Sequence, residues 1–185
     1  MSHFFTVALI PSDVPADKYE EYIGKIMEPF KEGSKGTYRS QYNDDSKWDY
    51  WLIGGRWSGI FEPDYDPEKD PANQEPCRFC AGTGGRATPP NSGPGDYPCN
   101  GCNATGTAVK WPSFWVQRGN SAPASPDLPA PFAFITPDSE WIERGKMGWW
   151  GIVTDESDES EWKAHAKAVY EKYHDHIAVA LDCHI

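Results

Sequence analysis

The sequence predicts an α+β fold, an antiparallel sheet with two helices, which is interrupted by an inserted four-cysteine zinc module. Three observations support this prediction. The chain begins with a strand-like run and a helical pattern, it ends with a helical pattern and a strand-like run, and a proline-rich stretch lies between them. This order of elements is compatible with a ferredoxin-like sandwich.

Composition divides the chain into a host domain and an insertion. Thirteen of the seventeen prolines lie between positions 62 and 131, where the hydrophobic periodicity also disappears. We therefore assign residues 1–61 and 132–185 to the α+β host domain. Residues 62–131 form a proline-rich insertion, which contains the zinc module at 77–106.

The first half of the host domain combines a strand, a helix and a hairpin. The run from Phe4 to Ile10 is apolar on both faces, as in a buried strand, and Pro11 ends it. A helix closed by Pro29 follows, because apolar side chains recur there at helical spacing. They are Tyr19, Tyr22, Ile23, Ile26, Met27 and Phe30. Farther on, strand-like runs flank Gly54 and Gly55, which indicates a hairpin, since both central residues of a type I′ turn need positive φ.

Two segments of the insertion precede the second half of the host domain. Residues 113–117 have the composition of a short strand and residues 121–131 that of a linker. Residues 132–135 and 140–143 then predict two strands joined by a turn, and residues 149–153 predict a further short strand. A helix follows, with acidic residues at its N-terminus, where the helix dipole favours them. Its apolar stripe consists of Trp162, Ala166, Val169, Tyr170 and Tyr173.

The last strand alternates between two faces. One face holds Ile177, Val179, Leu181, Cys183 and Ile185. The other face holds Ala178, Ala180, Asp182 and His184. Asp182 and His184 are thus about 7 Å apart on one face, which makes them a candidate general base or metal pair. Cys183 lies on the aliphatic face and is better explained as a core residue than as a nucleophile.

Overall composition limits the partners and the compartment. The chain has 17 Lys and Arg against 28 Asp and Glu, a net charge of −11, which disfavours duplex nucleic acid as a partner. No run approaches the roughly 18–20 apolar residues of a membrane span, so we expect no membrane partner. The N-terminus shows neither the basic region nor the cleavage site of a signal peptide, and clustered thiols favour a reducing compartment, so we expect a cytoplasmic protein.

The strongest motif is a double pair of cysteines. Cys77 and Cys80 form one C-x2-C pair, and Cys99 and Cys102 form the other. This spacing is typical of a four-thiolate zinc site. Because four thiolates complete a tetrahedral Zn²⁺ and leave no open position, we expect one structural Zn²⁺ per chain.

Glycines follow each pair, in the runs Cys80-Ala-Gly-Thr-Gly84 and Cys102-Asn-Ala-Thr-Gly106. Glycine lets backbone N–H groups turn toward the sulfurs without a clashing Cβ. The two repeats resemble the cysteine-rich zinc region of DnaJ-type chaperones. That region normally has four repeats and two zinc ions, whereas this chain has two repeats, Ala104 in place of a glycine, and no J-domain signature. The resemblance implies zinc ligation by the four cysteines, whereas chaperone activity is not carried over.

Two glycine loops of the host domain combine cations with tryptophans. One presents Arg56 and Trp57, and the other presents Arg144, Lys146 and Trp149. A guanidinium or ammonium group binds phosphate or carboxylate, and an indole ring stacks on a base, so the loops are a candidate site for an anionic or nucleotide ligand. The alternative is an aromatic core with cations whose charged ends reach solvent.

Four blocks of the host domain stand out: the N-terminal strand, Trp48–Trp57 with its Gly-Gly-Arg-Trp run, Lys146–Gly151 and Val179–Ile185. Together they resemble a family of small uncharacterised proteins of bacteriophages and bacteria. The likeness extends over most of the chain outside the proline-rich stretches. The family carries no function to transfer, but a phage origin would favour an accessory role, such as countering a host defence in the host cytoplasm.

These observations predict a zinc-stabilised binding protein rather than an enzyme, with an anionic or nucleotide-like ligand. Two alternatives stay open. A protein-interaction module would dock the zinc module and the acidic surface on a host protein, and a hydrolase would use Asp182 and His184 as catalytic residues.

Overall fold

Two strands from opposite ends of the chain form the centre of the main sheet. β1 (His3–Pro11) and β12 (His176–His184) pair antiparallel along their full length, with His3 opposite His184 and Pro11 opposite His176. The alternating pattern predicted for the last strand is confirmed, because the residues of its two faces belong to two different hydrophobic clusters.

The computed structural model describes residues 2–32, 46–86, 97–147 and 152–185. The chain divides into two compact units. The first unit comprises residues 1–63 and 117–185, and the second comprises residues 64–116. The second unit lies within the predicted insertion at 62–131, of which residues 62–63 and 117–131 belong to the first unit.

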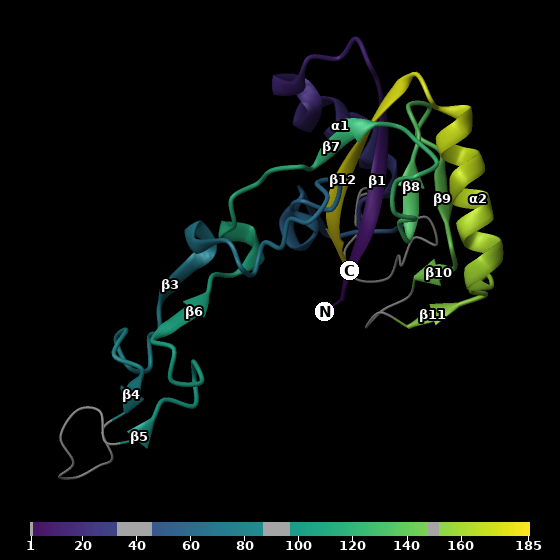
Figure 1. Ribbon diagram of the computed structural model, residues 1–185. Coiled ribbons are helices and arrows are strands. Elements are labelled where there is room, and N and C mark those ends of the chain that lie inside the picture. The colour runs from purple at the N-terminus through teal and green to yellow at the C-terminus, as the bar shows by residue number, and fades with distance from the viewer. Residues whose placement is uncertain (1, 33–45, 87–96, 148–151) are drawn as a thin grey trace. The chain divides into compact units, whose positions relative to one another are not determined.

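The main sheet has the strand order β2–β12–β1–β8–β9, and β7 also pairs with β12. Figure 1 shows β12, β1, β8 and β9 side by side. These further strands are β2 (Tyr50–Ile53), β7 (Ser121–Pro123), β8 (Ala133–Ile135) and β9 (Trp141–Glu143). The predicted antiparallel sheet is in fact mixed, since β8 runs parallel to β1. The chain makes a long crossover between β1 and β8, and a parallel pair requires such a crossover.

The two helices cover opposite faces of this sheet. β1 supplies both clusters: Phe4, Ala8 and Ile10 pack under α1 (Tyr19–Met27), and Phe5, Val7 and Leu9 pack under α2 (Glu159–Lys172). The first unit therefore has a helix–sheet–helix arrangement. A ferredoxin-like sandwich is not confirmed, because its two helices would share one face.

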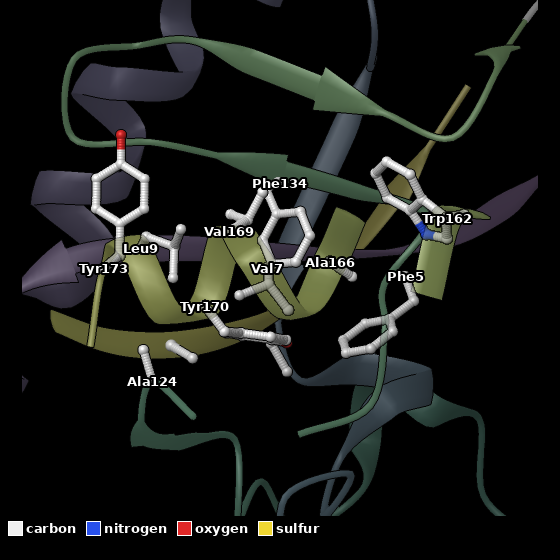
Figure 2. Close-up of a cluster of buried hydrophobic side chains, with 12 residues drawn as sticks. Phe5, Val7, Leu9, Ala124, Phe134, Trp162, Ala166, Val169, Tyr170 and Tyr173 are labelled. Carbon is white, nitrogen blue, oxygen red and sulfur yellow. The ribbon is translucent and has the colours of Figure 1, made fainter. Parts of the chain in front are cut away.

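The helix α2 has a side-chain cap at its N-terminus, whereas α1 has none in the part of the chain that the structure describes. Asp158 caps α2, accepting a hydrogen bond from the Ser160 N–H at 2.8 Å. Figure 2 shows the predicted stripe packed against the sheet, with the Tyr170 ring among β-strand side chains. Tyr170 is fully buried, its ring lies edge-on to Phe134 with centroids 5.0 Å apart, and its hydroxyl donates to the Pro129 carbonyl at 2.9 Å. The predicted stripe is confirmed.

The chain leaves the main sheet after β2 and returns to it at β7, and we call residues 54–120 between them the excursion. A single residue of β12, Ala180, forms hydrogen bonds with both ends of the excursion. The Gly54 N–H donates to the Ala180 carbonyl at 2.8 Å, and the Ala180 N–H donates to the Asn120 carbonyl at 2.8 Å. β2 pairs with β12 on one side of Ala180 and β7 pairs with it on the other side. The edge of the sheet is therefore one strand that the excursion interrupts.

The predicted hairpin at Gly54 and Gly55 is wrong. β2 ends at Ile53 and the chain turns into a 3-10 helix, Gly55–Trp57. The positive φ values of the two glycines, 75° and 54°, serve a close approach instead of a hairpin turn. A Cβ atom at Gly54 would lie 2.2 Å from Oε1 of Gln117, which comes from the returning end of the excursion.

Two further expectations for the insertion are corrected. In place of the strand predicted at 113–117, residues 113 and 114 end a 3-10 helix, Pro112–Phe114, and residues 115–117 are in neither helix nor strand. The linker predicted at 121–131 begins with β7, because the backbone of residues 121–123 finds a partner strand in β12. The strand predicted at 149–153 lies partly outside the described residues, and Val153–Thr154 forms β11, which pairs with β10 (Lys146–Met147).

The remaining elements are short. In the second unit β3 (Gln74–Pro76) pairs with β6 (Thr107–Val109), and β4 (Gly85–Arg86) pairs with β5 (Tyr97–Pro98). Other 3-10 helices span Ala16–Lys18, Glu28–Phe30 and Pro71–Asn73. Among the described residues, neither helix has the length and hydrophobicity that a bilayer span demands.

We expect Tyr170→Ala to lower the free energy of unfolding by about 3–5 kcal/mol, because it removes a large buried ring. Tyr170→Phe should cost about 1 kcal/mol, since only the hydrogen bond to Pro129 is lost. Urea unfolding followed by tryptophan fluorescence measures both. Tyr50→Ala is the control, because Tyr50 is 51% exposed. Equal effects of Tyr170→Ala and Tyr50→Ala would contradict this account of the core.

Candidate metal centre

The four predicted metal ligands lie together in the second unit. Cys77 and Cys80 form a knuckle, a short turn that presents two thiols, between β3 and β4, and Cys99 and Cys102 form a second knuckle between β5 and β6. All four side chains are buried, and all four Sγ atoms lie within 4.8 Å of one another. This cluster could hold a metal ion.

The sulfur spacing fits a single tetrahedral ion. Cys77 Sγ lies 3.9 Å from Cys99 Sγ, and Cys80 Sγ lies 3.8 Å from Cys102 Sγ. A tetrahedron with metal–sulfur bonds of about 2.3 Å has sulfur–sulfur edges of about 3.8 Å. The cysteines are free thiols, and the separation is far longer than the roughly 2.05 Å of a disulfide.

The two knuckles repeat each other with an offset of 22 residues. The Cys77 N–H donates to the Gly106 carbonyl at 2.8 Å, and the Cys99 N–H donates to the Gly84 carbonyl at 2.8 Å. The Thr83 hydroxyl donates to the Cys80 carbonyl, and the Thr105 hydroxyl donates in the same way to the Cys102 carbonyl. Each knuckle therefore holds the other in place.

Backbone N–H groups point at the sulfurs, as the sequence predicts. The Gly84 N–H donates to Cys80 Sγ at 3.3 Å, and the Gly106 N–H donates to Cys102 Sγ at 3.3 Å. Burial opposes ionisation of the Cys80 thiol, but the Gly84 N–H and the Cys102 thiol together bring its pKa down to about 7. Burial raises the pKa of Cys99 to about 11. The donors favour the thiolate form that binds metals.

The glycines that follow the knuckles differ in how tightly they are packed. A Cβ atom at Gly84 would lie 2.4 Å from the carbonyl oxygen of Ala104, and a Cβ atom at Gly106 would lie 2.4 Å from that of Gly82. Gly82 has more room, since the nearest atom to its added Cβ is 3.6 Å away. Its counterpart Ala104 has φ 63° and carries a methyl group. Only Gly84 and Gly106 are thus required to be glycine by contact.

The structure places Arg56 and Trp57 at the start of the excursion from the sheet. The Arg56 N–H donates to Asp182 Oδ2 at 3.0 Å, while its exposed guanidinium has no partner within the described part of the chain. Trp57 is half-buried, and its ring packs on Phe5 with centroids 5.3 Å apart. Arg56 is therefore available to a ligand, whereas Trp57 contributes to the core.

The second predicted loop lies at the opposite edge of the sheet. Arg144 follows β9, four strand spacings or roughly 19 Å from β2, so the structure does not bring the two loops together. Arg144 pairs with Glu156 at 3.2 Å. Lys146 pairs with Asp155 at 2.8 Å, and its ammonium group lowers the pKa of that carboxyl. Trp149 lies outside the described residues.

Asp182 and His184 do share a face, but each pairs with another residue. Asp182 is buried, and its Oδ1 forms a hydrogen bond with His3 Nδ1 at 2.8 Å. His184 Nδ1 lies 2.6 Å from Asp49 Oδ1. The rings of His3 and His184 meet edge-on with centroids 4.9 Å apart. Sequence reasoning missed His3 and Asp49, and antiparallel pairing of the two terminal strands was the signal that could have revealed His3.

We expect Gly84→Ala to impair metal retention far more than Gly82→Ala. Both changes put a side chain at positive φ, which costs about 1 kcal/mol, but only a Cβ at Gly84 collides with a backbone carbonyl. Competition with a chromogenic zinc chelator measures the affinity of each variant. The backbone would have to shift at the Cys80 sulfur, so a loss of tenfold or more is expected. Equal affinities of the two variants would contradict the packing described for the knuckles.

Comparisons of the chain with protein-family models, with curated protein sequences and with solved structures gave no match. The likeness to a family with a Gly-Gly-Arg-Trp block therefore stays a prediction, and so does the local likeness to the DnaJ-type zinc region. The cysteine cluster itself rests on the geometry of the described residues.

Proposed function

We propose that this protein is a zinc-stabilised binding protein in which one structural Zn²⁺ is held by Cys77, Cys80, Cys99 and Cys102. The observation that supports the proposal most strongly is the spacing of the four buried Sγ atoms, which matches a tetrahedron of thiolates around one ion. The N–H groups of Gly84 and Gly106 supply the outer hydrogen bonds that stabilise such thiolates.

The donor set favours a structural ion. Four soft thiolates in a tetrahedron suit Zn²⁺ and, among the alternatives, iron. Four protein ligands leave no position for water or substrate, which is the pattern of a structural site. The bound ion would stabilise the fold of the knuckles, and the surrounding residues would exclude water from the sulfurs.

The second unit also needs such an ion for its stability. The hydrophobic cluster around the knuckles consists of the four cysteines, with only Ala108 packed against them among the described residues. A structural zinc site contributes roughly 10–16 kcal/mol of apparent binding free energy, which is comparable to the net stability of a whole domain. The ion would thus replace the apolar core that this segment lacks.

For the ligand of the binding protein we propose an anionic or nucleotide-like molecule. Support comes from the exposed Arg56 guanidinium beside the half-buried Trp57. Arg144, Lys146 and Trp149 would form a second contact with the ligand. For this, the Arg144 guanidinium would first have to leave Glu156, and the Lys146 ammonium group would have to leave Asp155. The resemblance to phage proteins supports a counter-defence role for such a ligand-binding protein in the host cytoplasm.

Two alternatives remain candidates. A protein-interaction module would use the acidic surface that a net charge of −11 provides. A hydrolase would use Asp182 and His184, and the contacts of Asp182 favour the binding protein over this reaction. One oxygen of its buried carboxylate accepts from the Arg56 N–H, and the other bonds with His3. A carboxylate so engaged orients its neighbours more readily than it takes a proton from a substrate.

Zinc content and thiol reactivity test the metal proposal. We expect one Zn²⁺ per chain by elemental analysis, no thiol reactive toward a disulfide reagent in the native protein, four after chelation and five after denaturation. The fifth thiol is Cys183, which is fully buried and whose pKa burial raises to about 12. Cys183→Ala should leave the first two counts unchanged and reduce the last to four. A protein without zinc after expression in zinc-replete medium would refute the metal proposal.

A nucleotide panel scored by thermal shift tests the ligand proposal. A ligand at 100 times its Kd should raise the free energy of unfolding by about 2.7 kcal/mol. Arg56→Ala should abolish the shift, and Lys163→Ala should preserve it, because Lys163 is an exposed cation paired with Glu159 on α2. If no anion in the panel stabilises the protein, or if both variants lose the shift equally, the ligand does not bind at Arg56.

A further inference from the structure

The two knuckles differ at the positions that the metal does not use. Between its cysteines the first knuckle has Arg78 and Phe79, and the second has Asn100 and Gly101. Phe79 is 53% exposed, although it lies between the buried Cys77 and Cys80. Its ring lies directly on Gly101, where an added Cβ would be 2.4 Å from the ring. A structural zinc site does not require an exposed ring at this position.

Two guanidinium groups lie over the Phe79 ring. The Arg78 guanidinium carbon is 5.0 Å from the ring centroid, and that of Arg86 is 5.6 Å from it. Arg86 also donates from Nη1 to Oδ1 of Asn100 in the other knuckle. These contacts hold both guanidinium groups against the ring while leaving N–H donors for an anion.

A second exposed ring lies on the neighbouring strand. Tyr97 of β5 is directly opposite Arg86 of β4, so their side chains are on the same side of this two-stranded sheet. Tyr97 is 58% exposed. We call the set Arg78, Phe79, Arg86, Tyr97 and Asn100 the knuckle patch.

The two segments that carry the cysteines are basic within an acidic chain, although Glu75 lies two residues before Cys77. Residues 77–86 and 97–110 contain Arg78, Arg86 and Lys110 and no Asp or Glu, while the chain has a net charge of −11. The one acidic residue between positions 77 and 110 is Asp96. An acidic protein with a local basic surface directs an anionic partner to that surface.

We propose that the knuckle patch binds single-stranded nucleic acid. The guanidinium groups would contact phosphates, and bases would stack on Tyr97 and on the guanidinium planes that cover Phe79. A duplex hides the faces of its bases, so exposed rings favour a single strand. This inference rests on the proposed zinc site, because the ion positions both knuckles.

A competing explanation assigns the arginines to the metal. A zinc ion with four thiolates has a formal charge of −2, and nearby guanidinium groups would offset it. That explanation accounts for Arg78 and Arg86, but it gives no reason for two exposed aromatic rings. The rings and the arginines must therefore be tested separately, with zinc content measured for every variant.

Fluorescence anisotropy with a labelled oligothymidylate of about 12 nucleotides tests the proposal, since one site of this kind covers roughly 4–16 nucleotides. Tyr97→Ala should weaken binding about tenfold or more, because a stacked base contributes about 1–3 kcal/mol. Phe79→Ala should also weaken binding, because Arg78 and Arg86 lose the ring against which their guanidinium groups lie. The double variant Arg78→Gln, Arg86→Gln should weaken binding and reduce the slope of log K against log salt by about 1.4, which corresponds to about 0.7 for each phosphate contact.

Matched controls come from the same unit. Phe114→Ala removes a ring that is 72% exposed outside the knuckles, and Lys69→Gln removes an exposed cation paired with Asp66. Neither should change the affinity for the oligonucleotide. If the arginine variant loses zinc, the two ring variants decide the question, because they keep the charge.

Several results would overturn the proposal and leave the zinc site standing. They are a zinc-loaded protein that does not bind the oligonucleotide at low salt, equal losses in the knuckle-patch and control variants, and equal affinity for a hairpin duplex. If a polyglutamate peptide at equal charge displaces the oligonucleotide, the patch binds anions in general, and the proposal of a nucleic-acid site is overturned. Absence of zinc would instead refute the metal proposal on which the patch depends.

Discussion

The pairing of β12 is the constraint on which the first unit depends. This strand binds β1 along one edge and both β2 and β7 along the other, so it fixes the two ends of the chain and the base of the excursion at once. The register of this strand is strongly constrained, because a shift of one residue would move Asp182 from the α2 face of the sheet to the α1 face. The same shift would break the two bonds of Ala180 to Gly54 and Asn120.

The hydrogen bonds at the two ends of the excursion bring these ends together, so the second unit has to fold only within the segment between them. The excursion leaves and returns at Ala180, and its two arms bond to each other: Gly59 N–H donates to the Arg118 carbonyl at 2.7 Å, and Arg118 forms an ion pair with Glu62. Hydrogen bonds of the sheet thus offset the entropy that is lost when the long loop is closed. This loss of entropy rises only slowly with loop length. A metal ion then has to order only the two knuckles. An ion bound by four thiolates can do this without an apolar core.

Local periodicity predicted those parts of the fold whose signal lies within one segment, such as β1, the stripe of α2 and the alternation of β12. It failed where the decisive partner is distant in sequence. Ser121–Pro123 has the composition of a linker and becomes a strand because β12 offers it an unpaired edge. Gly54 and Gly55 have the pattern of a hairpin, but Gln117 occupies the space beside them. The cysteines were predictable because their spacing alone determines the chemistry, whereas the pairing of Asp182 with His3 follows only from the register of β1 and β12.

The near-symmetry of the knuckles separates what the metal requires from what it leaves free. Cysteines, threonines and the closely packed glycines recur in both knuckles. The glycine N–H groups donate to a sulfur, and each threonine hydroxyl donates to a cysteine carbonyl of its own knuckle. The residues between the cysteines do not recur. Phe79 and Gly101 nevertheless depend on each other, because the ring occupies the space that a side chain at Gly101 would need. A ring held in this way loses little conformational freedom when it meets a partner. The structural ion and the exposed surface are therefore linked: the metal fixes the backbone on which the ring and its two guanidinium groups are arranged in advance.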